Sequence, residues 1–127
     1  MNAQITEDYV SFETAKLLKE KGFDADIDIW YDENGDAFFC HKYDISHNWR
    51  TRQKQEVYLR PTLQMARKWL RKVHNLHIVI EPLVAGNYVI YIDRISNKEC
   101  IGSDITYEKA CDAAIKYCLE YLVEINT

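Results

Sequence analysis

The dipeptide Asn34-Gly35 constrains the fold more than any other feature of the sequence. It separates two β-rich runs, residues 27–32 and 36–43, and Asn-Gly between such runs is the strongest short-range signal for a tight hairpin. In the first run, aspartates alternate with apolar residues, so we expect one wet face there. These aspartates are Asp26, Asp28 and Asp32.

A second hairpin is predicted in the last third of the chain. Two β-rich runs, residues 76–84 and 87–95, surround a turn near Gly86. Pro82 cannot donate a hydrogen bond to a neighbouring strand, which favours an edge position or a bulge there. A short third strand is expected over residues 99–102. We therefore expect antiparallel hairpins that form one sheet.

Three helices are predicted from apolar periodicity and from residues that suit helix ends. The first covers residues 11–21, the second follows Pro61 and ends near residue 75, and the third runs from 106 to about 125. The apolar residues of the third helix fill so wide an arc that it should lie flat across the sheet. The predicted end residues are Ser11, Gly22, Thr62, Asn75 and Thr106.

These elements give the order α-β-β-α-β-β-(β)-α, and we expect one α+β domain over residues 1–127, with the helices packed on an antiparallel sheet. Residues 44–60 lack periodicity and are expected to form an exposed connection. Similar apolar and basic positions in the first two helices, each followed by a hairpin, are also typical of an internal duplication. Shared helix patterning would give the same similarity, so both interpretations stay open.

Charge is distributed unevenly along the chain. Residues 41–74 hold nine of the 16 Lys and Arg residues but only two of the 20 Asp and Glu residues, in a protein of net charge −4. A basic segment in a weakly acidic protein indicates a surface for a negatively charged partner.

The predicted second helix separates its cations from its apolar residues. Its apolar arc consists of Leu63, Ala66, Trp69, Leu70 and Val73, and the cations lie opposite. The preceding segment adds further cations and an aromatic ring. The candidate anion- or partner-binding surface is Trp49, Arg50, Arg52, Lys54, Arg67, Lys68, Arg71 and Lys72.

No residue pattern predicts a catalytic site, a cofactor site or a metal site. The histidines and cysteines lack the convergent spacing of zinc ligands. Asp32, Asn34 and Asp36 resemble the start of a calcium loop. However, Ala37 stands where that loop needs glycine, and Tyr43 stands where it needs glutamate.

The four cysteines form no CxxC pair, which favours reduced thiols in a cytoplasmic protein. No apolar run approaches the roughly 20 residues needed to span a bilayer, so no membrane association is expected. The first ten residues also lack the basic and apolar regions of a secretory signal.

Three stretches of sequence resemble a known family. They are ITEDYVSFETAKLLKEKGFD, PTLQMARKWLRKVHNLHI and TYEKACDAAIKYCLEYL. Together they resemble small uncharacterised proteins that recur in phage and prophage regions of gut Bacteroidetes genomes. The resemblance covers about half of the chain and implies a cytoplasmic, phage-borne accessory protein. It implies no biochemical role and no site residues.

From these observations we expect a non-enzymatic module that binds a protein partner or forms a homodimer. The alternative is a nucleic-acid-binding accessory protein that uses the basic helix face and the 49–54 segment. The C-terminal order α-β-β-(β)-α also occurs in double-stranded RNA-binding domains, although their Gly- and Lys-rich motif is missing here. A pI near 5.5 disfavours a dedicated nucleic-acid-binding domain.

Overall fold

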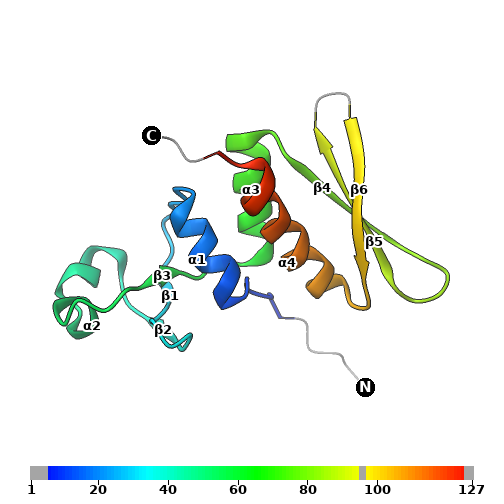
Figure 1. Cartoon of the computed structure of the whole chain (residues 1–127). Coiled ribbons are helices and arrows are strands. Elements are labelled where there is room, and N and C mark those ends of the chain that lie inside the picture. Colours follow the sequence, from blue (N-terminus) through cyan, green and yellow to red (C-terminus); the bar gives the residue numbers. More distant parts are fainter. Residues whose placement is uncertain (1–5, 95–96, 125–127) are drawn as a thin grey trace, which may run out of the picture.

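The computed structural model describes residues 6–94 and 97–124, and its helices and strands form an α+β fold, as predicted (Figure 1). In chain order the elements are α1 (Phe12–Glu20), β1 (Ile29–Tyr31), β2 (Ala37–Phe39), η1 (Lys42–His47), α2 (Trp49–Arg52), β3 (Tyr58–Leu59), α3 (Leu63–His74), β4 (His77–Pro82), β5 (Tyr88–Arg94), β6 (Asn97–Asp104), α4 (Tyr107–Tyr117) and η2 (Cys118–Leu122).

The two predicted hairpins are present, but they belong to two sheets and not to one. The first sheet has the order β2-β1-β3 and the second has the order β4-β5-β6, with all neighbours antiparallel. β4 is an edge strand and ends at Pro82, as predicted. The central strand of the first sheet is β1, which is the first strand of its hairpin. The central strand of the second sheet is β5, which is the second strand of its hairpin. The similarity of the two helix-hairpin units therefore does not extend to strand order.

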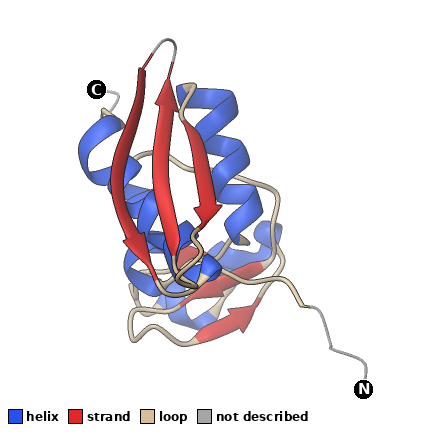
Figure 2. Ribbon diagram, turned by 90° about the vertical axis from the view of Figure 1, so that its right-hand side faces the viewer, coloured by secondary structure: helices blue, strands red, loops and turns tan. Residues whose placement is uncertain are grey.

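Helices α3 and α4 cover one face of the β4-β5-β6 sheet (Figure 2). α4 lies between that sheet and α1, so it is surrounded by apolar side chains on several sides (Figure 1). This position explains its wide apolar arc, because a helix with neighbours on several sides needs more than one apolar stripe. The fully buried α4 residues are Ala110, Cys111, Ala114 and Ile115.

The helix ends are fixed by local hydrogen bonds. Ser11, Thr62 and Thr106 each accept a hydrogen bond from the main-chain N–H three residues later, which satisfies a donor at the helix start. Gly22 has φ +90°, and the N–H of Phe23 donates to the Leu18 carbonyl at 2.9 Å. This is the Schellman pattern. The last helix continues from α4 into η2 and ends at Leu122, before the predicted end near residue 125, because Val123 has an extended backbone.

Residues 44–60 are exposed or half-buried, as expected, but the expectation of an irregular connection is wrong. This segment contains part of η1, the short helix α2 and the strand β3, which pairs with β1 through Trp30 and Leu59. β6 is also longer than predicted, since it spans eight residues. A two-residue strand leaves no periodic pattern, so only its pairing with β1 reveals it.

Asp32 does not lie on a wet strand face. Its exposed fraction is 7%, and its carboxylate accepts hydrogen bonds from the N–H groups of Asn34 (2.9 Å) and Asp36 (3.0 Å). An aspartate that bonds the main chain two residues later stabilises a tight turn. Gly35 completes that turn with φ +85°. Asp32 is therefore a structural residue of the first hairpin.

Candidate functional site

The solvent face of α3 combines apolar and cationic side chains. Met65 is 37% exposed and Val73 is 59% exposed, although Val73 was predicted to lie in the buried arc. Lys68, Arg71 and Lys72 are exposed on the same helix. Met65 and Val73 line one shallow hollow together with Lys68 and Lys72, so apolar and cationic side chains lie side by side on this surface. We call these five residues the α3 face.

The three cations of the α3 face have no acidic partner in the described part of the chain. No carboxylate oxygen of residues 6–94 or 97–124 lies within 4 Å of their charged nitrogens. Asp24 lines the same shallow hollow as Lys68 and Lys72, but its carboxylate is bound by Lys42. The local positive charge is therefore not neutralised from within.

Arg67 does not belong to this exposed group, although the helix pattern placed it there. Its guanidinium donates to the Tyr107 hydroxyl at 2.9 Å and to the Ile78 carbonyl at 2.8 Å. It therefore links α3 to the start of α4 and to the edge strand β4. Its guanidinium therefore stabilises the fold through internal hydrogen bonds.

The predicted residues of the 49–54 segment lie apart from the α3 face. Figure 1 shows α2 at the far end of the molecule from α3. Arg50 stacks on Phe38 and on the half-exposed Trp49, with 4.3 Å and 4.7 Å from its guanidinium carbon to the two ring centroids. Its Nε also lies 3.7 Å from an Asp32 oxygen, so Arg50 supports the first hairpin.

Arg52 and Lys54 are exposed, and no carboxylate of the described residues lies within 4 Å of their charged nitrogens. They form a second, smaller basic group beside α2. Of the eight predicted residues, three thus lie on the α3 face and two form the basic group at α2. Arg50 and Arg67 serve the fold, and Trp49 packs against Arg50.

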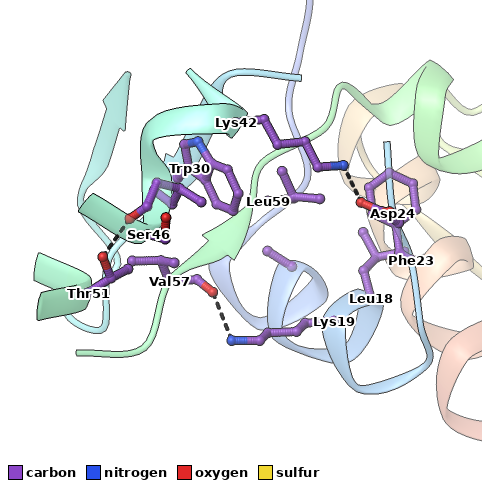
Figure 3. A pocket seen from close by; sticks show the side chains of 12 residues that line it. Leu18, Lys19, Phe23, Asp24, Trp30, Lys42, Ser46, Thr51, Val57 and Leu59 are labelled. Atoms are coloured by element: carbon purple, nitrogen blue, oxygen red, sulfur yellow. Dashed lines mark hydrogen bonds and ion pairs between the residues drawn. The ribbon is translucent and has the colours of Figure 1, made fainter. Parts of the chain in front are cut away.

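A cavity of about 270 Å³ opens between α1, β1, β3 and the 42–57 segment (Figure 3). Its wall is mostly apolar, with Leu18, Phe23, Trp30, Val57 and Leu59 among the lining residues. Sequence reasoning missed it, because the wall combines residues from segments that the pattern treated as unrelated. No single motif marks a cavity of this kind.

Burial shifts the pKa values of two thiols and one imidazole. Burial raises the pKa of the Cys118 thiol to about 12 and also raises the pKa of Cys111, so both remain protonated and unreactive. Burial lowers the pKa of His74, whose ring packs edge-on against Trp69 at 4.7 Å between centroids.

No group of three or more His, Cys, Asp or Glu side chains in residues 6–94 and 97–124 is arranged to hold a metal ion. Within the same residues, no helix is both long and apolar enough to cross a bilayer.

Comparison with known proteins found no matching family model, no matching curated protein and no matching solved structure. The resemblance to phage-borne proteins therefore stays a prediction.

Proposed function

We propose that the protein is a non-enzymatic interaction module whose α3 face binds an acidic, partly apolar surface of a partner protein. The observation that carries this proposal is the juxtaposition of exposed Met65 and Val73 with three cations that have no acidic partner among the described residues. The apolar side chains supply buried contact area, and the cations select an acidic partner.

The charge of the α3 face favours a different protein over a second copy of this chain. A two-fold symmetric dimer brings the same patch of both subunits together. Through this face, such a dimer would place Lys68, Arg71 and Lys72 opposite their own copies. Like charges in contact oppose association, so we place the partner's acidic residues there instead. A cytoplasmic role in a mobile element agrees with the sequence resemblance and is part of the same proposal.

Nucleic-acid binding is the second candidate. The order α3-β4-β5-β6-α4 follows that of double-stranded RNA-binding domains, and the exposed cations could contact phosphates. The exposed Val73 and Met65 separate the two candidates, because phosphate contacts gain nothing from apolar side chains.

Peptide titration followed by NMR tests the proposal. The probes are a helical peptide with leucines on one face and flanking glutamates, a polyglutamate of the same length, and a 20-base-pair RNA or DNA duplex. We expect the amphipathic peptide to shift the amide signals of α3 and polyglutamate to have little effect. Lys72→Glu and Val73→Ser should each weaken peptide binding several-fold. Val84→Ser, at a fully exposed valine in the β4–β5 turn, is the control for the same substitution and should leave binding unchanged.

Other outcomes would count against the protein-binding proposal. Tighter binding of a duplex, weakened by Lys72→Glu but not by Val73→Ser, would establish the nucleic-acid alternative. Equal effects of Val84→Ser and Val73→Ser would show that the α3 face is not the site. A concentration-dependent dimer in light scattering that Lys72→Glu strengthens would show that the face binds a second copy.

A further inference from the structure

The cavity between α1 and the 42–57 segment has the size and lining of a small-molecule site. It contains no residue of the α3 face, although Asp24 lines both the cavity and the hollow beside that face. Leu18, Trp30 and Leu59 contribute its apolar wall, and Lys19 and Lys42 lie at its rim (Figure 3). A closed apolar cavity of about 150 Å³ accommodates benzene, so a volume near 270 Å³ suits about ten to twelve non-hydrogen atoms. Ligand sites of proteins are typically apolar concavities with a few polar groups, as here.

Most polar groups of the wall already have partners within the protein. The indole N–H of Trp30 donates to the Cys40 carbonyl at 2.9 Å. The Thr51 hydroxyl donates to the carbonyls of Ile45 and Asn48. A ligand in contact with these residues therefore meets an apolar surface and needs no hydrogen bonds there.

The two rim lysines keep unused donor capacity. Lys42 is bound by the Asp24 carboxylate and by the Ala25 carbonyl at 2.8 Å. Lys19 is bound by Glu56 at 2.6 Å and by the Val57 carbonyl at 3.0 Å. An ammonium group has three N–H donors, so each lysine has one left after these bonds.

Two cations and one anion line the cavity, and Glu56, which lies outside the wall, pairs with Lys19 at 2.6 Å. The carboxylate of that anion, Asp24, belongs to a side chain that is 75% exposed. The hydroxyl of Ser46, also a lining residue, has no hydrogen-bond partner among the described residues. Lys19, Lys42 and Ser46 each keep one unused donor at the rim, and an acceptor on the ligand would satisfy these donors.

We propose that this cavity binds a compact aromatic or aliphatic carboxylate, with its apolar body against Trp30 and Leu59 and its carboxylate at Lys42 or Lys19. The apolar body matches the wall, and the carboxylate accepts the free ammonium donors. This site does not depend on the proposed role of the α3 face. A ligand of this size is expected to bind with a dissociation constant near 1 mM.

Three probes with one apolar body and different head groups test the proposal. They are 3-phenylpropionate, 3-phenylpropanol and 3-phenylpropylamine, titrated into the full chain and followed by NMR. We expect the acid to shift the indole N–H signal of Trp30 and to bind at least fivefold more tightly than the alcohol. The amine should bind most weakly. The double variant Lys19→Met/Lys42→Met should reduce the affinity for the acid to that for the alcohol.

A matched pair of variants locates the site. Ser46→Phe introduces a ring at the cavity mouth and should abolish binding of the acid. His47→Phe introduces the same ring one residue later, at an exposed position that does not line the cavity, and should leave binding unchanged. If Ser46→Phe does not fold, Val57→Trp blocks the cavity from its other side.

Equal binding of the acid and the alcohol, or tightest binding of the amine, would overturn the carboxylate assignment. Unchanged binding in both Ser46→Phe and Val57→Trp would overturn the site itself. Signals from the α3 face should not move in either case, so failure of this proposal is distinguishable from failure of the proposed function.

Discussion

Replacing Arg67 with glutamine should destabilise the protein far more than the same change at Arg71, one helical turn later. Arg67 donates two hydrogen bonds at 2.8–2.9 Å, whereas no carboxylate of the described residues lies near the Arg71 guanidinium. A hydrogen bond to a charged group contributes about 1.5–3 kcal/mol, and partial exposure reduces that value. We therefore expect Arg67→Gln to lower the free energy of unfolding by about 2–3 kcal/mol in total.

Urea unfolding monitored by tryptophan fluorescence measures this difference directly. A loss of about 2–3 kcal/mol corresponds to a fall in Tm of roughly 8–12 °C for a chain of this size. Arg71→Gln should change stability by less than about 0.5 kcal/mol, as is usual for exposed side chains. The comparison holds only if the slope of the unfolding free energy with urea stays the same in both variants.

A double-mutant cycle with Tyr107→Phe separates the hydrogen bond from other effects. Arg67 and Tyr107 should show a coupling of about 0.5–1.5 kcal/mol, because each loses its partner in the single variants. Arg71 and Tyr107 should show none. Equal losses for Arg67→Gln and Arg71→Gln, or zero coupling at Tyr107, would refute the internal role of Arg67.

Three further results are expected. Burial lowers the pKa of His74 below 6.5, so the unfolded chain binds a proton that the native state lacks as pH falls below 6.5. Native stability should therefore fall there by at most about 1.4 kcal/mol per pH unit, and His74→Gln should show a shallower decline in urea unfolding at pH 7.5 and 5.5. A thiol reagent at pH 8 should label the exposed Cys100 quickly and should reach the buried thiols only after unfolding; rapid labelling of all four would contradict their burial. The buried thiols are Cys111 and Cys118. Gly35→Ala should cost more stability than Gly86→Ala. Both glycines have positive φ, but only at Gly35 would the added carbon lie 3.1 Å from the Phe12 ring. Equal thermal shifts in the two variants would show that the Phe12 contact does not matter.

The parts of the fold that were predictable are the parts that neighbouring residues determine. Ser11, Thr62 and Thr106 start their helices through hydrogen bonds that span three residues. The turn at Asn34-Gly35 is likewise closed by bonds within five residues. Such local preferences do not depend on contacts with distant segments, so helix starts and tight turns can be predicted from the sequence pattern alone.

The division into two sheets was not predictable in the same way. It depends on the pairing of Trp30 with Leu59, across a segment that contains η1 and α2. β3 has only two residues, too few for a period-two pattern to indicate a strand. Its partner β1 could equally have paired with a strand of the second hairpin, and only tertiary packing decides between these pairings.

In the candidate site, too, helix periodicity predicts where the cations lie on α3, but contacts with distant segments decide which of them are exposed. Part of the charge segregation along the sequence is balanced within the molecule, since the acidic first third pairs with the basic middle through Asp24–Lys42 and Asp32–Arg50. On α3, Arg67 and Arg71 are four residues apart and share one side of the helix, so periodicity treats them alike. What separates them is the position of β4 and Tyr107, which comes from elements later in the chain. The cations that can select an external partner are those that these later elements leave exposed, and this explains why a helix pattern of four cations leaves only three on the α3 face.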